Sequence, residues 1–331
     1  MTKAGVAVRC QSRIRSVCPS CAELYRGDWA AIARSGVFDG PVRDFRFYLL
    51  TLTAPSFGRV HRVPKVEGAK VGQCGCDATH TVADADLRGV PLDMASYDYA
   101  GLVAWNRDSG LLWDRTRRRL RDYWPSVEFF VVREWQDRGA LHLHALVRIA
   151  RTEAPRPERL GDAARTASAF SLVDGALVSW GEQGNCQAFR ADGDAAKTIW
   201  YLSKALNYVL KDAVTASGGG ARAWAHLSRL SAAARSMRCS RECAPRDCVS
   251  RTHQRYGARG HVVSASRRTR HRVGWSFTGM TRKKQRQLRR EWVAARAAGA
   301  ESSPAERVVA VLEAGAVRAE RELRARVVAI P

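Results

Sequence analysis

The stretch that most constrains the fold is a pair of apolar runs at residues 127–134 and 141–149. Both are rich in the aliphatic, β-branched and aromatic residues that favour strands. The segment between them, residues 135–140, is mostly polar and contains Gly139, which favours a turn. The pattern predicts an antiparallel β-hairpin.

This hairpin would gather two histidines and a glutamate on one face. Side chains alternate along a strand, so His142 and His144 lie on the same side. A hairpin centred on Arg138 places Glu134 opposite His142 and Val132 opposite His144. Two imidazoles and a carboxylate suit a divalent metal such as Mg, Mn, Co or Zn, with positions left open for substrate oxygens. The alternative is two ordinary polar histidines on a sheet surface, which the opposed glutamate makes less attractive.

The charge of the chain points to a polyanionic partner. Its 331 residues are 46% hydrophobic, enough for a core, yet carry a net charge of +23. Such a charge suits nucleic acid or an acidic membrane surface. There is no run of about eighteen apolar residues, and the N-terminus lacks the apolar core of a signal peptide. We therefore expect a cytoplasmic protein that binds nucleic acid and no membrane.

Basic residues dominate residues 267–290. The predicted DNA contacts there are Arg282, Lys283, Lys284 and Arg286. They would neutralise phosphates and make binding strongly salt-dependent. The alternative is a solvated basic face without a role.

Nine cysteines without a secretion signal favour metal ligation or free thiols over disulfides. Cys18 and Cys21 form a C-x-x-C knuckle with Cys10 shortly before it, and Cys74 and Cys76 lie farther along with a histidine, His80, close behind. Three or four of these five thiolates would suffice for a tetrahedral structural zinc site, and unliganded cysteines are the alternative. The group Cys239, Cys243 and Cys248, followed by His253, leaves zinc and free thiols equally open, and Cys186 looks solitary.

Further elements follow from periodicity and from glycine and proline positions. We expect a helix near residues 23–26, a strand at 46–53, a helix at 97–124 and a helical piece near 224–227. Residues 151–190 suggest loops with one more strand pair, and residues 304–328 an amphipathic tail helix. The expected units are a Cys-rich knuckle (1–36), a central domain (37–216) and a basic, mostly helical DNA-binding region (217–331).

A capped helix is also predicted at residues 195–211, where one face repeats tyrosine and lysine. Each tyrosine begins a Y-x-x-K unit, Tyr201 with Lys204 and Tyr208 with Lys211. A phenol has a pKa of about 10, but nearby ammonium groups and a metal-bound phosphate favour the phenolate. Beside a metal, that nucleophile suits transesterification of a phosphodiester. The alternative is an ordinary solvent-facing helix.

Taken in order, these motifs resemble those of rolling-circle replication initiators of the HUH endonuclease superfamily. The strand at residues 47–53, the His142-Leu143-His144 motif and Y-x-x-K follow in the order used there. Other segments resemble the RepSA-type initiators of actinobacterial plasmids and integrative elements, and the resemblance covers most of residues 8–275. These segments are residues 18–25, 52–58, 91–93 with 97–101, and 257–261.

The resemblance implies an α+β fold with a central antiparallel sheet that carries the metal site, flanked by helices. It also implies Glu134 as the third metal ligand and Mg or Mn as the metal. The structural zinc expected in the cysteine sites follows from their spacing and not from this resemblance. The protein would nick one strand of origin DNA, keep the 5′ end as a phosphotyrosine and leave a 3′-hydroxyl. Its partners would be single-stranded origin DNA and the host helicase and polymerase.

The nucleophile stays open, because the family joins its two Y-x-x-K units directly and here Ala205-Leu206-Asn207 separates them. Likeness to single-tyrosine members favours Tyr208 over Tyr201. Two other functions compete with replication initiation. One is a conjugative relaxase or single-strand transposase with the same site, and the other is a zinc-dependent DNA-binding regulator without enzymatic activity.

Overall fold

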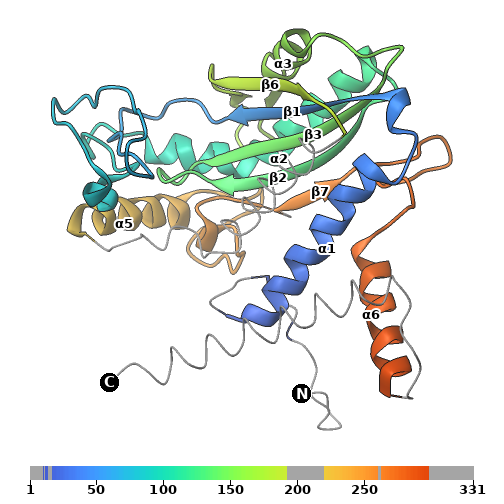
Figure 1. The fold of residues 1–331 in the computed structure, drawn as a ribbon. Coiled ribbons are helices and arrows are strands. Elements are labelled where there is room, and N and C mark those ends of the chain that lie inside the picture. The colour runs from blue at the N-terminus through green and yellow to red at the C-terminus, as the bar shows by residue number, and fades with distance from the viewer. Residues whose placement is uncertain (1–9, 11, 14–16, 192–219, 260–261, 298–331) are drawn as a thin grey trace.

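A five-stranded antiparallel sheet in the order β6-β1-β3-β2-β7 forms the centre of the computed structural model (Figure 1). The structure describes residue 10 and residues 12–13, 17–191, 220–259 and 262–297. The sheet strands are β1 (Phe45–Thr53), β2 (Glu128–Trp135), β3 (Leu141–Ala150), β6 (Gly184–Phe189) and β7 (Val263–Ala265). A separate pair consists of β4 (Ser168–Phe170) and β5 (Leu177–Ser179).

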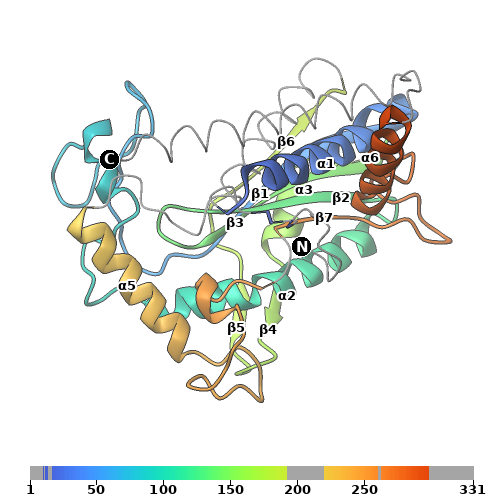
Figure 2. The same cartoon turned by 90° about the horizontal axis from the view of Figure 1, so that it is seen from below.

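Helices flank the sheet, as the predicted α+β class requires. They are α1 (Pro19–Phe38), α2 (Tyr99–Tyr123), α3 (Pro157–Arg165), α5 (Ala221–Ser236) and α6 (Arg282–Ala297), with short 3-10 turns η1 (Val42–Asp44), η2 (Val82–Leu87) and η3 (His253–Arg255). Figure 2 shows α1 and α2 on opposite sides of the strands. Among the described residues, no helix combines the length and apolar composition needed to cross a bilayer.

The hairpin of β2 and β3 has the register predicted from the sequence. Glu134 pairs with His142, and Val132 pairs with His144. On its other side β3 pairs with β1, where Thr51 lies opposite His144. The alternation of apolar and polar side chains is therefore sufficient to fix which residues share a face.

The helix α2 covers one face of the sheet. It begins after Asp98, whose carboxylate accepts a hydrogen bond of 2.7 Å from the backbone N–H of Gly101. Its apolar side buries Leu102, Leu112 and Leu120 in the core that includes the strand residues facing it. This is the helix predicted at residues 97–124.

The opposite face is covered by α1. Its residues Ile32 and Val37 pack in a second core with Phe130 and Leu146 of the hairpin and with Trp275. Gly36 allows this approach, because a Cβ atom there would lie 2.1 Å from Nε1 of Trp275. The sequence predicted only a short helix in this region, because the small and polar residues of α1 give a weak apolar stripe.

A buried arginine joins the end of α1 and the segment after β7 to the sheet. The guanidinium of Arg148 on β3 donates to the carbonyl oxygens of Gly36, Gly274 and Trp275 at 2.7–2.8 Å. It also lies 3.7 Å from the ring centroid of Phe277. The residue is 1% exposed, so carbonyl dipoles, aromatic faces and the charge of Glu128 stabilise the buried guanidinium.

Some elements were not predicted. Residues 151–190 hold the expected strand pair, β4–β5, but also α3 and the edge strand β6. β7 comes from the region assigned to a C-terminal DNA-binding unit, yet it extends the central sheet beside β2. The division at residues 36 and 216 therefore stays a prediction about domains. The helices predicted at residues 195–211 and 304–328 lie outside the described residues.

Candidate metal centre

Glu134, His142 and His144 lie together at one end of the β2–β3 hairpin. Their ligand atoms all lie within 4.8 Å of one another. Nε2 of His144 is 3.3 Å from Oε1 of Glu134, and the two imidazole centroids are 4.5 Å apart. Two ligands at about 2.1 Å from one tetrahedral ion are separated by about 3.4 Å, so the donor set fits a single divalent ion.

The neighbouring strand orients His144. The hydroxyl of Thr51 on β1 lies 3.0 Å from Nδ1 of His144. This contact leaves Nε2 as the nitrogen that faces Glu134, and a polar partner on the second nitrogen is typical of metal-binding histidines. The His144 side chain is 4% exposed and that of Glu134 is 22% exposed. His144 is thus fixed from the neighbouring strand β1, and the Glu134 side of the group is partly accessible to solvent.

The electrostatics favour the protonation states that a metal needs. Burial lowers the pKa of His142 to about 4, and the positive charge of His144 acts in the same direction. Burial alone would raise the pKa of Glu134, but the hydrogen bond and charge of His144, together with His142, outweigh it and lower that pKa. At neutral pH His142 therefore has a free lone pair and Glu134 is a carboxylate.

The turn that joins the two strands is held by buried and partly buried hydrogen bonds. Asn106 of α2 donates to the carbonyl oxygen of Gly139 at 2.9 Å and accepts from the N–H of Leu141 at 2.9 Å. The guanidinium of Arg138 donates to the carbonyl oxygens of Ala54 and Pro55, both at 3.0 Å. The carbonyl of Arg138 lies 3.3 Å from Nε2 of His226 on α5. Neither Asn106 nor His226 was predicted from the sequence, because both lie on helices without a recognisable motif.

The structure does not describe the residues predicted as the nucleophile and its lysine neighbours. Tyr201, Lys204, Tyr208 and Lys211 lie outside the described residues. Their relation to Glu134, His142 and His144 stays a prediction.

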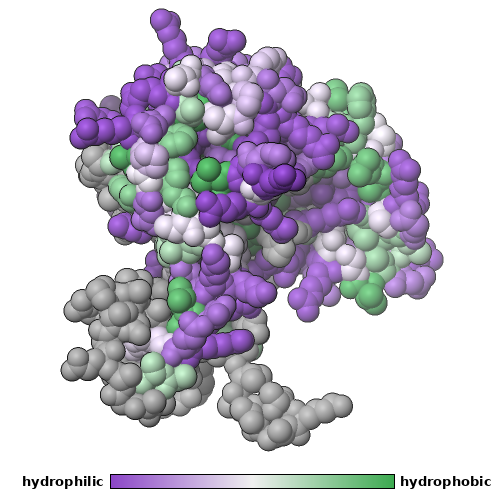
Figure 3. Space-filling view, turned by 90° about the vertical axis from the view of Figure 1, so that its right-hand side faces the viewer, coloured by the Kyte–Doolittle hydropathy of each residue, from purple (hydrophilic) through white to green (hydrophobic). Residues whose placement is uncertain are grey.

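Of the predicted DNA contacts on α6, two are exposed and one is engaged within the protein. Lys283 and Lys284 are exposed, and Arg286 is partly buried. Nε of Arg282 lies 3.4 Å from a carboxylate oxygen of Asp28, and its guanidinium is 4.2 Å from the ring centroid of Tyr25. The side of the molecule drawn in Figure 3 is mainly hydrophilic, with hydrophobic residues in smaller groups.

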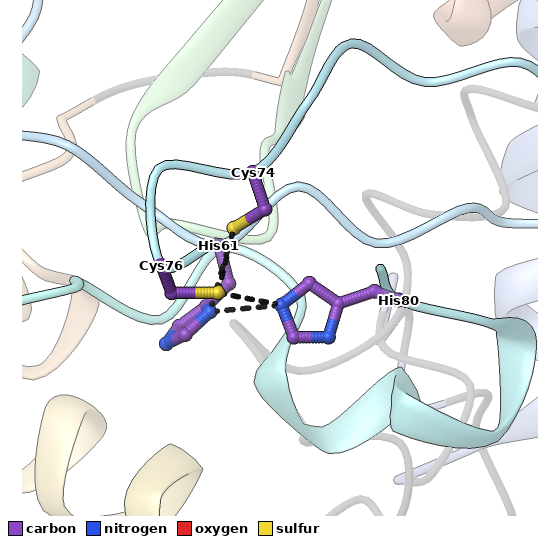
Figure 4. Close-up of side chains that lie close together, drawn as sticks. All are labelled: His61, Cys74, Cys76 and His80. Atoms are coloured by element: carbon purple, nitrogen blue, oxygen red, sulfur yellow. Dashed lines mark hydrogen bonds between the residues drawn. The ribbon is translucent and has the colours of Figure 1, made fainter. Parts of the chain in front are cut away.

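The cysteines predicted to share one zinc site fall into separate clusters. Cys10, Cys18 and Cys21 form one group beside the start of α1. Cys74 and Cys76 instead lie with His61 and His80 (Figure 4). Three of the five thiolates, Cys10, Cys18 and Cys21, therefore lie together, and Cys74 and Cys76 belong to a different cluster. Zinc binding by the first group stays a prediction. His61 was missed, because a histidine that far before Cys74 gives no recognisable spacing.

The cysteines of the last group also lie together with a histidine. Cys239, Cys243, Cys248 and His253 offer ligand atoms within 4.8 Å of one another. Cys186 belongs to none of the three clusters and lies partly buried on β6. No cysteine in the described residues forms a disulfide bond.

Comparison with known proteins gives the family. The profile described as "RepSA: Replication initiator protein, pSAM2" matches residues 1–328. A replication initiator protein of Streptomyces ambofaciens is 34% identical, over 56% of this chain and 48% of the relative, so the chain spans about half the length of that relative. No solved structure is significantly similar. Because the profile covers nearly every residue, the chain belongs to the RepSA family of replication initiator proteins.

Proposed function

We propose that this protein starts replication by nicking one strand of origin DNA through metal-assisted tyrosine transesterification. One observation carries the proposal: the register of β2 and β3 brings Glu134, His142 and His144 to one face, with ligand atoms within 4.8 Å. Family membership supplies the biological setting, a replication initiator. The net charge of +23 suits a DNA substrate.

The three side chains would hold Mg²⁺ or Mn²⁺. The bound ion would polarise a non-bridging oxygen of the scissile phosphate. Glu134 supplies negative charge that favours a divalent cation, and the imidazoles of His142 and His144 supply nitrogen ligands. Thr51 keeps the His144 ring in its ligating orientation.

The nucleophile is a tyrosine of the Y-x-x-K segment, Tyr208 in first place and Tyr201 as its alternative. The phenol loses its proton to solvent, its oxygen forms a bond to phosphorus, and the bond to the 3′ oxygen breaks. Lys211 or Lys204 stabilises the phenolate by its positive charge. The products are a 5′-phosphotyrosine and a 3′-hydroxyl, which the host polymerase extends after the host helicase opens the duplex in the cytoplasm.

Exposed Lys283 and Lys284 on α6 are proposed to contact phosphates of the origin DNA. Each neutralised phosphate releases a condensed counterion, so affinity falls with salt. Arg282 contributes less in this proposal, because Asp28 and Tyr25 already contact its guanidinium.

The decisive test is the covalent adduct. Labelled single-stranded oligonucleotides that tile the DNA flanking the coding sequence are incubated with the purified chain and Mn²⁺ or Mg²⁺, then separated on a denaturing gel. We expect an adduct that chelation abolishes and that is absent from Tyr208→Phe or, under the alternative, from Tyr201→Phe. The matched control is Tyr123→Phe, an exposed tyrosine of α2.

The same assay separates the competing functions. Tight, sequence-specific binding without any adduct, in both metals and with every oligonucleotide, would contradict the nuclease and favour a DNA-binding regulator. An adduct that persists in His142→Ala together with His144→Ala would refute the metal centre while keeping the tyrosine chemistry.

A further inference from the structure

We propose that His61, Cys74, Cys76 and His80 bind a structural zinc ion that braces the turn of the β2–β3 hairpin. This site is distinct from the group formed by Glu134, His142 and His144. Figure 4 shows the four side chains converging from the long loop between β1 and α2, here called the Cys-His loop (residues 59–92).

The four ligand atoms have the spacing of a tetrahedral site. Around the ring they form, Nδ1 of His61 is 3.2 Å from Nε2 of His80, and that nitrogen is 3.2 Å from Sγ of Cys76. Sγ of Cys76 is 3.3 Å from Sγ of Cys74, which is 3.7 Å from Nδ1 of His61. Zinc bonds of about 2.0 Å to nitrogen and 2.3 Å to sulfur imply ligand separations of about 3.3 to 3.8 Å. Two imidazoles and two thiolates are a donor set that zinc prefers.

A second layer of contacts prepares His80 for this role. Its other ring nitrogen, Nδ1, lies 3.5 Å from a carboxylate oxygen of Asp84. That carboxylate also accepts a hydrogen bond of 2.9 Å from the backbone N–H of Thr81, in the capping box of η2. A carboxylate on the far nitrogen places the proton there and leaves Nε2 free to bind metal.

The loop needs such an anchor because it has almost no core of its own. Every residue from 65 to 73 is exposed, and Cys74 is the sole buried residue between Lys65 and Thr79. No helix or regular strand occurs between the end of β1 and η2. Exposed backbone of this length costs conformational entropy that apolar burial does not offset here.

The loop is joined directly to the hairpin turn. The N–H of His61 donates to the carbonyl oxygen of Val90 at 2.8 Å, and the N–H of Gly89 donates to the carbonyl oxygen of His61 at 3.3 Å. Gly89 has φ +74 and packs against the turn, since a Cβ atom there would lie 2.5 Å from the backbone nitrogen of Arg138. Nζ of Lys65 reaches a carboxylate oxygen of Asp137 at 3.3 Å. An ion that fixes His61 therefore restrains the turn between the strands that hold Glu134 and His142.

The first test measures zinc. The full chain is purified under reducing conditions, and its zinc content is determined by elemental analysis for wild type, Cys76→Ser and the matched control Cys186→Ser. We expect Cys76→Ser to lose one equivalent of zinc and Cys186→Ser to lose none. Cobalt replacement should give the intense visible bands of a tetrahedral thiolate site, weakened in Cys76→Ser. Equal zinc in all three proteins, or a Cys74–Cys76 disulfide found by thiol counting, would overturn the site.

The second test measures the bracing. Hydrogen exchange is followed at residues 136–140 in the same three proteins. Faster exchange at this turn in Cys76→Ser, with unchanged exchange in β1 and α2, supports the link. Loss of zinc without any change in exchange at the turn would overturn the bracing role. If exchange becomes faster throughout Cys76→Ser, the measurement is repeated with His61→Gln.

A second zinc site, which shares no ligand with the first, is formed by Cys239, Cys243, Cys248 and His253. We infer this site because Sγ of Cys239 is 3.6 Å from Sγ of Cys248, and Sγ of Cys243 is 3.6 Å from Nε2 of His253. Nδ1 of His253 lies 2.8 Å from the carbonyl oxygen of Ala234 on α5, so Nδ1–H donates and Nε2 faces the thiols. The ion would tie the segment after α5 back onto that helix.

This second site is tested by additivity. Cys243→Ser should lose one zinc equivalent, and the double variant with Cys76→Ser should lose two, because the clusters share no ligand. Loss of the same single equivalent in both single variants and in the double variant would overturn two separate sites.

Discussion

The carboxylate of Asp28 on α1 accepts hydrogen bonds of 2.8 and 2.7 Å from the guanidinium of Arg289 on α6. Asp28 is fully buried and Arg289 is 7% exposed. Removal of one partner leaves an uncompensated buried charge, so we expect Asp28→Ala to lower the free energy of unfolding by about 3–5 kcal/mol. Urea unfolding measures it. Asp162→Ala, which removes an exposed pair with Arg165, should cost less than about 1 kcal/mol, and similar losses in both variants would contradict the prediction.

Asn106 should contribute to both stability and metal binding. It is fully buried and satisfies backbone groups of Gly139, Leu141 and Tyr256, each at 2.9 Å. Asn106→Ala leaves these backbone groups without a hydrogen-bond partner, which costs about 1–3 kcal/mol of stability for each unsatisfied group before the structure relaxes. We expect a total loss of about 2–4 kcal/mol by urea unfolding and weaker Mn²⁺ binding. Gln187→Ala on the exposed side of β6 should change neither.

The free energy of unfolding should depend on pH through His226. Burial lowers the pKa of its imidazole from 6.5 to about 4 in the folded chain, although the hydrogen bond to the Arg138 carbonyl partly opposes this. As pH falls below about 6.5 the unfolded chain takes up the proton first, so stability decreases until about pH 4 and then levels off. The loss is at most about 3.5 kcal/mol, at about 1.4 kcal/mol per pH unit.

The free energy of unfolding of the metal-free protein, measured by urea unfolding at pH 7.5, 6 and 5, should show this dependence. His142 shifts in the same direction, so the contribution of His226 is the difference between wild type and His226→Gln. Identical pH profiles for the two proteins would exclude it.

Glu134→Gln should weaken Mn²⁺ binding more than about tenfold, since even the loss of an outer contact to a metal ligand has an effect of that size. The substitution keeps the shape of the side chain and removes its charge. Paramagnetic resonance of free Mn²⁺ measures the affinity. Glu182→Gln, an exposed glutamate just before β6, is the charge-matched control, and equal affinities in the two variants would remove Glu134 from the centre.

Lys283→Ala and Lys284→Ala should each weaken DNA binding by a similar factor for every sequence and lower the slope of log affinity against log salt by about 1. Fluorescence anisotropy from low to moderate salt gives both quantities. The control is Arg118→Ala on the outer side of α2, whose side chain already pairs with Asp114. A change confined to one DNA sequence would indicate base contacts instead.

The sequence was sufficient for the parts of the fold that depend on local pattern. The register of Glu134 and His142 followed from strand alternation and one glycine-containing turn, and α2 followed from its apolar stripe. Strand alternation, turn residues and an apolar stripe are set by residues close together in the sequence, and packing in the core stabilises the same elements.

Other features depend on contacts between distant residues. His61 lies beside Cys74 and Cys76 only because the loop folds back on itself, and the spacing of the three residues in the sequence does not predict this contact. β7 has three residues in a basic region, and it forms a strand because β2 offers it an edge. The separation of Cys18 and Cys74 into different clusters likewise depends on where α1 packs.

The buried guanidinium of Arg148 also has a consequence for synthesis of the chain. Its partners are the carbonyl oxygens of Gly36, Gly274 and Trp275, so the early and late parts of the chain meet on it. While the ribosome is still translating the middle of the message, β1, β2 and β3 can pair, but Arg148 has no Trp275 beside it. The α1 side therefore closes only after Trp275 has emerged, and until then a nascent chain exposes an apolar surface of the kind that chaperones bind.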